Sequence, residues 1–305
     1  MIVDKYSKNY ILKTFVIKIF VIANVLIIDL ASALALDQQS NNYSINNPNM
    51  SSSSTKKKQQ HHMLFLHGQF VTPECYTSKF ATKLFEKLES TGDWDVDIPL
   101  SPRITKDPTP PIMIEWFPNQ KVHPEWINSE THTEEDGSTT TKTYHGLKES
   151  LNWLKEYIMN KPYKYDIIAG HSNGAIMTAL LAFMMEKTMT MNTSDTDTPP
   201  YLPQDKHCNG IIIFNAPNSF ETERTLMKEY IARDGPMITS IPSLHVFSST
   251  NDAWVGDGST KMLTSHFPKP SSGKTVVIDH ENGHWFPTDD KHYDQILQFM
   301  NQHTT

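Results

Sequence analysis

A glycine-bounded turn between a strand and a helix is the sequence feature that most restricts the fold. Residues 165–169 form a short apolar run that leads directly into the pentapeptide 170–174, Gly-His-Ser-Asn-Gly. The apolar residues 175–186 follow at once and predict a helix. Glycine at 170 and 174 allows a tight turn in which larger side chains would collide with neighbouring backbone. A G-x-S-x-G pattern in this setting predicts a strand–turn–helix unit, with the turn at the carboxyl end of a strand of an open α/β sheet.

Strands and helices alternate along the rest of the chain. Strands are predicted at 63–66, 94–98, 165–169, 210–214, 243–248 and 274–278. Helices are predicted at 76–88, 144–158, 175–186, 226–232 and 293–300. Residues 99–143 are rich in Pro, Thr and acidic residues, and they predict mostly loop, with an exposed insertion at 128–143. The alternation predicts a mostly parallel sheet with helices on both faces.

Composition favours one large globular domain. The chain has 305 residues, of which 38% are hydrophobic, and this is enough apolar material for a sizeable core. A net charge of −7 disfavours a general nucleic-acid-binding surface. The two cysteines, Cys75 and Cys208, are compatible either with one disulfide or with two free thiols.

The N-terminal region allows two interpretations. The uncharged run from Ile19 to Ile28 has ten residues, too few to span a bilayer, but it suits a secretory signal peptide over residues 1–35. Residues 36–62 are rich in Ser, Asn and Gln and predict a linker before a domain at 63–305. The secretory pathway is then expected. In the alternative interpretation Met50 is the true start, residues 1–49 belong to an over-long gene model, and the protein is cytoplasmic.

Ser172 lies at the centre of the predicted turn, between the strand and the first residues of the helix. Such a turn presents the hydroxyl above the sheet, where the positive end of the helix dipole favours a developing oxyanion. Serine is a weak nucleophile, so this chemistry also requires a base, and the base requires an acid that orients it.

An acid and a base follow Ser172 in the chain order Ser, Asp, His. Asp252 comes soon after the predicted strand 243–248, and His284 lies in the loop after the predicted strand 274–278. Both therefore belong to the carboxyl edge of a parallel sheet, where sites of this architecture gather. Asp257 and His280 are the reserve candidates for the same two roles.

An oxyanion would need two backbone N–H donors. One is expected from Asn173, the residue after the nucleophile. The other is expected from the loop after the first strand, around Gln69 or Phe70.

Residues 280–284, His-Glu-Asn-Gly-His, also satisfy H-E-x-x-H, a zinc-peptidase pattern in which both histidines share one face of a helix. Asn282 and Gly283 are poor helix formers, and Pro287 follows closely. The segment is therefore interpreted as a strand end and loop, although Asp289 or His292 could supply a third ligand.

Four segments together resemble the FSH-type serine hydrolases. They are Leu-Phe-Leu-His-Gly at 64–68, Gly-Leu-Lys-Glu-Ser-Leu at 146–151, Ile-Pro-Ser-Leu-His-Val at 241–246 and Gly-His-Trp-Phe-Pro at 283–287. The resemblance covers about residues 63–289. It implies an α/β-hydrolase fold, esterase-like activity, a location in the cytoplasm and nucleus, and a triad of Ser172, Asp252 and His284.

The chain departs from the usual motifs of that family at three positions. His171 stands where the family usually has Phe, and Asn173 where it usually has Gln. Asn282 replaces the first glycine of the usual Gly-Gly-His. None of these changes removes a candidate catalytic group.

The sequence therefore predicts a serine hydrolase that cleaves carboxylic esters or thioesters through a Ser-Asp-His triad and an acyl-enzyme intermediate. A small-molecule ester or thioester is the expected partner, with no nucleic acid, no stable membrane span, and no metal or cofactor. The alternatives are a non-catalytic binding protein on the same fold and, with less support, the zinc peptidase.

Overall fold

The computed structural model describes residues 60–133, 140–190, 202–217, 240–252, 254, 264, 267 and 274–304. All of them belong to the unit Lys57–Thr305. The predicted signal peptide, nearly all of the predicted linker and the predicted helix at 226–232 lie outside the described residues. In the part of the chain that the structure describes, no helix combines the length and apolar character needed to cross a bilayer.

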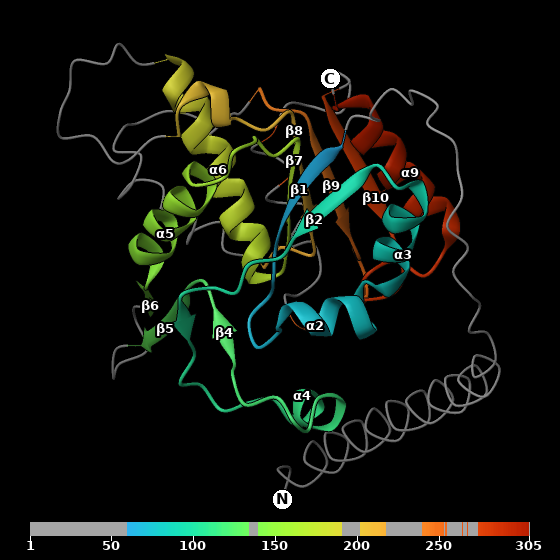
Figure 1. The fold of residues 1–305 in the computed structure, drawn as a ribbon. Helices are drawn as coiled ribbons and strands as arrows, with labels where there is room; N and C mark the ends of the chain where they lie inside the picture. The colour runs from blue at the N-terminus through green and yellow to red at the C-terminus, as the bar shows by residue number, and fades with distance from the viewer. Residues whose placement is uncertain are drawn as a thin grey trace, which may run out of the picture. The chain divides into compact units, whose positions relative to one another are not determined.

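Six parallel strands form the central sheet, in the spatial order β10-β9-β8-β7-β1-β2 (Figure 1). Their bounds are β1 (His61–Leu66), β2 (Trp94–Asp97), β7 (Ile167–His171), β8 (Gly210–Phe214), β9 (Ser243–Phe247) and β10 (Thr275–Asp279). The central strands β7, β8 and β9 are buried at every residue, as expected for a parallel sheet covered on both faces, whereas the edge strands β2 and β10 are partly exposed. The predicted parallel sheet is therefore confirmed.

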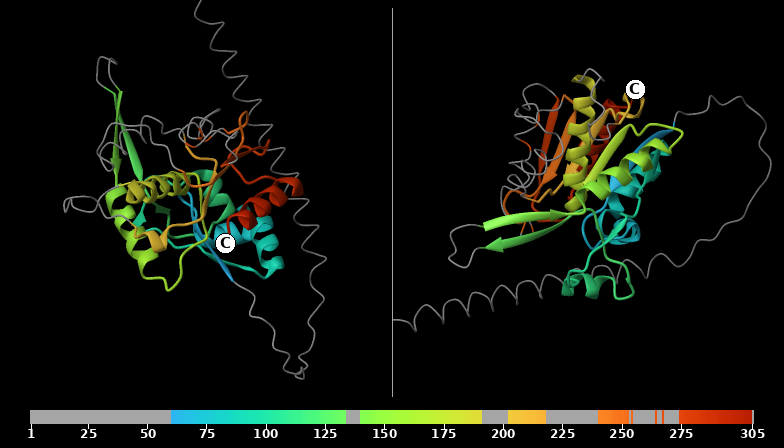
Figure 2. Two further views of the ribbon diagram at one scale, coloured as in Figure 1. Left: turned by 90° about the horizontal axis from the view of Figure 1, so that it is seen from above. Right: turned by 90° about the vertical axis from the view of Figure 1, so that its left-hand side faces the viewer.

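Helices cover both faces of this sheet, as predicted (Figures 1 and 2). Alternate residues of each strand point to opposite faces. On β1, Leu64 and Leu66 join the core beneath α5 (Leu147–Met159) and α6 (Asn173–Thr190). Met63 and Phe65 join the opposite core, which α3 (Thr82–Thr91) and α9 (Asp290–Gln302) cover.

The first strand begins earlier than predicted. His61 and His62, which the sequence placed in the linker, pair in parallel with the start of β2. The ring of His62 also stacks on that of Tyr163, with 3.7 Å between centroids, and His61 lies 5.3 Å from the ring of Trp94. Ring packing and strand pairing therefore order two residues whose polarity suggested a linker.

The four predicted helices that the structure describes all differ from their predicted bounds, and two of them are not simply longer helices. The helix predicted at 76–88 is three segments: α2 (Pro73–Cys75), a π-helical turn (Tyr76–Phe80) and α3. The helix predicted at 144–158 begins only at Leu147, because Gly146 has a φ of 81° in the left-handed region.

Residues 99–143 contain more regular structure than predicted. Two antiparallel pairs occur there, formed by β3 (Arg103–Ile104) with β4 (Pro124–Glu125) and by β5 (Asn128–Thr133) with β6 (Thr140–His145). The segment also holds α4 (Pro111–Trp116), and a 3₁₀ turn (Gln204–Lys206) precedes β8. The β5–β6 hairpin extends away from the sheet (Figure 2). It lacks the apolar alternation that would have revealed it in the sequence.

The order of the strands creates one topological switch. After β1 the chain passes to β2 on one side, and it later returns to β7 on the other side of β1. In open α/β sheets, ligands bind outside the carboxyl ends of the strands at such a point. The loops that leave β1 and β7 therefore define where a site is to be sought.

Candidate active site

The turn after β7 has the strained geometry of a nucleophile elbow. Ser172 has a φ of 53°, in the left-handed region that a non-glycine residue rarely adopts. A Cβ atom at Gly174 would overlap the carbonyl oxygen of Leu66, and one at Gly170 would overlap the carbonyl oxygen of Gly174. The two glycines are therefore required because the turn presses against β1 and against the first turn of α6. Strain of this kind costs about 1–3 kcal/mol and marks functional positions.

Asp252 and His284 meet at the carboxyl edge of the sheet. The loop after β9 carries Asp252 and the loop after β10 carries His284, and both side chains are buried. His284 Nδ1 lies 2.9 Å from Asp252 Oδ2, while the Trp254 N–H donates to Asp252 Oδ1 at 3.0 Å. Because the carboxylate can only accept, Nδ1 carries the proton and Nε2 is left as the basic nitrogen.

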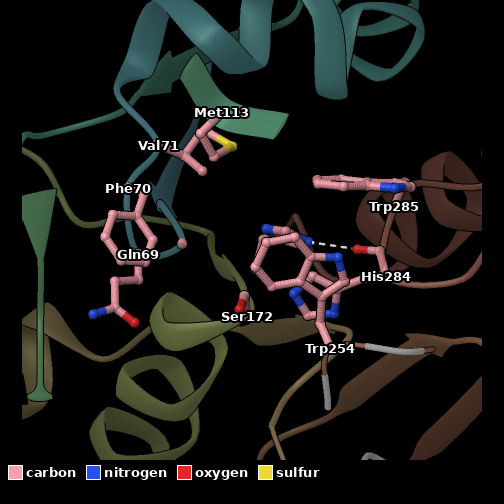
Figure 3. Close-up of a pocket in the computed structure, with 10 residues that line it drawn as sticks. Gln69, Phe70, Val71, Met113, Ser172, Trp254, His284 and Trp285 are labelled. Atoms are coloured by element: carbon pink, nitrogen blue, oxygen red, sulfur yellow. Dashed lines mark hydrogen bonds between the residues drawn. The ribbon is translucent and has the colours of Figure 1, made fainter. Parts of the chain in front are cut away.

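Ser172 and His284 line one cavity (Figure 3). The Ser172 hydroxyl forms no hydrogen bond with any residue that the structure describes. Rotation about a serine χ1 changes the direction of the hydroxyl, and catalytic hydrogen bonds often tighten only when substrate binds. Of the reserve candidates, Asp257 lies outside the described residues. His280 Nδ1 is occupied by the N–H of Asn282, at 3.2 Å.

The backbone hydrogen bonds of the loop after β1 separate the two predicted oxyanion donors. The Phe70 N–H donates to the Pro124 carbonyl at 2.9 Å, so it is not open to a ligand, and this part of the prediction is corrected. The Gln69 N–H has no partner among the described residues. The Gly68 carbonyl accepts from His67 Nδ1 at 2.7 Å. In a trans peptide the next N–H points the opposite way, so the Gln69 N–H is directed away from His67.

The Asn173 N–H, the other predicted donor, lies at the start of α6, where backbone N–H groups have no helical partner. Its side chain has a role that the sequence did not reveal. Asn173 Oδ1 accepts from the N–H groups of Trp126 and Ile127 at 3.0 and 3.1 Å, and Nδ2 donates to the Ile127 carbonyl at 3.0 Å. Asn173 therefore fastens the segment after β4 to the elbow.

The cavity has a volume of about 70 Å³, and the described residues that line it include no Asp, Glu, Lys or Arg. Its lining residues are Gly68, Gln69, Phe70, Val71, Met113, His171, Ser172, Trp254, His284 and Trp285. Trp254 lies over the ring of His284, with 6.0 Å between the centroids (Figure 3). Trp254 and Trp285 lie within two residues of Asp252 and His284 in the sequence, so their presence in the site could have been predicted. Met113 lies in the segment that the sequence analysis interpreted as loop, and nothing in the sequence around it indicated a place in the site.

The zinc-peptidase pattern does not form a helix. Residues 280–284 continue from the end of β10 into a turn, as predicted. His284 Nδ1 faces Asp252, and His280 Nδ1 faces the Asn282 N–H. Within the described ranges, no three His, Cys, Asp or Glu side chains are grouped so that they could hold a metal ion. Cys75 and Cys208 are both free and buried.

Four buried histidines are expected to make the fold sensitive to acid. Burial lowers the pKa values of His67 and His280 to about 4, and those of His171 and His245 to about 3. The unfolded chain, with histidine pKa values near 6.5, binds more protons than the folded chain below that pH. Stability therefore falls as the pH decreases from about 6.5 toward 4, by up to about 1.4 kcal/mol per pH unit for each histidine.

Urea unfolding at pH 7, 6 and 5 tests this expectation. The free energy of unfolding should drop by roughly 4–5 kcal/mol between pH 6 and pH 5. His245 lies on β9, where its Nε2 is 3.2 Å from Ser243 Oγ. A His245→Leu variant should lose about a quarter of the pH dependence. A free energy that stays constant over this interval would contradict the assignment of neutral buried rings.

Comparison with known proteins places the chain in a family. Residues 54–296 match the model of the family described as serine hydrolase (FSH1), whereas the curated proteins give no match. Similar solved structures include acyl-protein thioesterase 2 of Zea mays, with 14% identity, 82% of this chain and 96% of that chain covered, and a TM-score of 0.48. SOBER1 of Arabidopsis thaliana has 13% identity, 81% and 100% coverage, and a TM-score of 0.45. The carboxylesterase of Bacillus cereus has 13% identity, 81% and 90% coverage, and a TM-score of 0.41.

Structural likeness at this level carries no argument about activity, so the assignment rests on the family match. That match extends over most of the chain and includes the elbow at Ser172 as well as the loops of Asp252 and His284. The protein therefore belongs to the serine hydrolase (FSH1) family, an enzyme family whose members this chain resembles in sequence from residue 54 to residue 296.

Proposed function

We propose that this serine hydrolase cleaves small carboxylic esters or thioesters, with Ser172 as nucleophile, His284 as general base and Asp252 as the acid that orients it. One observation carries the proposal: His284, whose Nδ1 lies 2.9 Å from the buried Asp252, lines the same cavity as the strained serine. A histidine whose Nδ1 is held by a carboxylate presents a basic Nε2, as acyl transfer to serine requires.

The reaction would proceed in two steps. Ser172 Oγ attacks the acyl carbonyl carbon while His284 Nε2 takes the hydroxyl proton, and the oxyanion that forms accepts hydrogen bonds from the N–H groups of Asn173 and Gln69. The intermediate collapses, and His284 returns the proton to the departing alcohol or thiol. Water then attacks the acyl-enzyme by the same route, which releases the acid and restores the free serine.

The character of the cavity restricts the acyl group. The described residues of its walls carry no charge and many are aromatic, so an uncharged apolar acyl chain fits better than an acidic or basic one. A water-sized group needs roughly 10–15 Å³ of such volume, so 70 Å³ accommodates about five to seven heavy atoms. Acyl chains of about four to six carbons are therefore expected to be the best substrates.

Hydrolysis of p-nitrophenyl esters from acetate to dodecanoate by the full-length chain tests both the proposed reaction and the expected acyl-chain length. We expect kcat/KM to peak at four to six carbons and to fall at least tenfold by ten carbons. Met113→Ala removes part of the wall, so the optimum should move to longer chains. Ile114→Ala, on the same helix but exposed to solvent, is the matched control and should leave the optimum unchanged. An optimum at long chains in all three proteins would refute the size argument.

Covalent labelling separates this proposal from its alternatives. A fluorophosphonate should label one serine, which peptide mapping should identify as Ser172, and a chelator should not reduce ester turnover. Absence of both label and turnover would favour the non-catalytic binding protein. Peptidase activity that a chelator abolishes would favour the zinc enzyme.

A further inference from the structure

A buried chain of hydrogen bonds connects the two loops of the candidate site. The Gly68 N–H donates to the Tyr76 hydroxyl oxygen at 2.6 Å, and that oxygen lies 2.9 Å from His171 Nδ1. At the other end, His171 Nε2 lies 2.9 Å from the carbonyl oxygen of His284 (dashed line in Figure 3). Tyr76 and His171 are both at most 1% exposed. The chain thus runs from the loop after β1 to the loop that carries the candidate base.

Only one arrangement of protons satisfies every group in this series of hydrogen bonds. The His284 carbonyl can only accept, so His171 Nε2 must carry the proton and Nδ1 must accept. The Tyr76 hydroxyl then donates to Nδ1 while its oxygen accepts from Gly68. A neutral ring is needed for this, and burial does lower the pKa of His171 to about 3. Burial likewise raises the pKa of Tyr76, which keeps the hydroxyl protonated.

A second donor holds the same carbonyl. Asn215, directly after β8, has a φ of 45°, and its Nδ2 donates to the carbonyl oxygens of His284 and Trp285 at 3.2 and 3.0 Å. Its Oδ1 accepts from the Ser248 N–H at 3.3 Å. The backbone of His284 is therefore fixed from the ends of β7 and β8, whereas its imidazole is fixed by Asp252 from the end of β9.

We propose that His171 and Tyr76 are positioning residues that hold the backbone of the candidate base and the oxyanion loop in one geometry. The proposal rests on the function proposed above, because it assigns a role within the same site. A phenylalanine at position 171 would fill the space of the ring. It would leave the Tyr76 hydroxyl without an acceptor and the His284 carbonyl without one of its two donors.

Replacement by that phenylalanine is the first test. In the full-length chain, His171→Phe and Tyr76→Phe should each lower kcat for short p-nitrophenyl esters by roughly tenfold to a hundredfold, with KM nearly unchanged. The double variant should be little worse than either single variant, since both substitutions break the same chain. His171→Gln carries an acceptor beside a donor and should recover part of the loss.

Tyr165→Phe is the matched control for the loss of a buried tyrosine hydroxyl. Tyr165 is 1% exposed, and its hydroxyl donates to Asp97 at 2.6 Å at the opposite end of β7. The Tyr165→Phe substitution should lower the melting temperature and leave kcat unchanged. If His171→Phe and Tyr76→Phe also change only the melting temperature, the positioning role is refuted, and these hydrogen bonds contribute to stability alone.

Nitrogen NMR of ¹⁵N-histidine-labelled protein gives a result that does not depend on turnover. His171 should show a protonated Nε2 and an unprotonated Nδ1 across neutral pH. The Nδ1–H resonance of His284, which reports its bond to Asp252, should broaden or shift in His171→Phe but not in Tyr165→Phe. An unaltered resonance would overturn the proposal even if no ester proves to be a substrate, whereas absence of turnover with the expected NMR changes would count only against the proposed reaction.

Discussion

Replacing Ser172 by alanine is expected to lower kcat for ester hydrolysis by roughly 10⁴- to 10⁶-fold. The substitution deletes the one atom that would attack the carbonyl, and the structure describes no other hydroxyl on the cavity wall. At about 1.4 kcal/mol per decade, the loss corresponds to roughly 5–8 kcal/mol of transition-state stabilisation. The oxyanion donors and the apolar walls remain, so ester binding should change little.

The fold should survive this substitution. Alanine is smaller than serine, it can occupy the same backbone conformation at similar cost, and the hydroxyl has no hydrogen bond with a described residue that would be lost. A melting temperature within a few degrees of wild type is therefore expected. Ser90→Ala, at an exposed site on α3, is the control for a serine outside the site. Residual activity above about one per cent, with stability unchanged, would mean that another residue is the nucleophile.

The central sheet was predictable because its strands are short apolar runs that end at glycine or at polar residues. The runs at 63–66 and 210–214 needed no long-range information, since a strand buried on both faces is apolar throughout. The β5–β6 hairpin was not predictable in the same way. Its residues are mainly Thr, Glu, His and Lys, so their spacing carries no sign of a buried face.

Some features of the candidate site could likewise be predicted from the sequence, and others could not. Chain order and strand ends sufficed to suggest Ser172, Asp252 and His284, because parallel strands bring their carboxyl ends to one edge. The hydrogen bond from Phe70 to Pro124 joins segments more than fifty residues apart, and nothing local to Phe70 announces it. Backbone donors leave no side-chain signature. Their availability therefore follows only from the folded structure.

The same limit applies to His171. In the sequence His171 stands out only as a departure from the usual family motif, and its burial alone would be consistent with simple packing. Its hydrogen bonds to Tyr76 and to the His284 carbonyl depend on loops that lie 95 and 113 residues away in the chain. Sequence locates such a histidine in an elbow, but only the three-dimensional structure supplies its partners.

Substitution of Asp252 by asparagine is expected to lower kcat by roughly 10³- to 10⁴-fold with little change in KM. The two carboxylate oxygens both accept: Oδ2 from His284 Nδ1 at 2.9 Å and Oδ1 from the Trp254 N–H at 3.0 Å. Asparagine has only one accepting oxygen. If its NH₂ faces His284, Nδ1 must become the acceptor, and the proton moves to Nε2, where it blocks base catalysis.

The opposite orientation of the amide is also unfavourable. It would keep the correct histidine tautomer but set the NH₂ against the Trp254 N–H, so that two donors face each other at a buried position. The first orientation therefore keeps both hydrogen bonds but imposes the wrong histidine tautomer, and the second loses the bond from the Trp254 N–H. In both, the loss of charge removes the stabilisation of the imidazolium that forms during the reaction. Isosteric replacement should preserve the fold, so the defect should lie in kcat and not in the amount of folded protein.

Asp279→Asn is the matched control for this experiment. Asp279 ends β10 on the same edge of the sheet, is exposed, and accepts from the N–H and hydroxyl of Ser249 at 3.0 and 2.6 Å. Its substitution should alter kcat less than twofold. If Asp252→Asn retains activity within tenfold of wild type while Ser172→Ala is inactive, a different carboxylate must orient His284, and Asp257 would be the next to replace. If both aspartate variants lose activity equally, loss of charge at this edge, and not the geometry of the Asp252–His284 pair, would explain the defect.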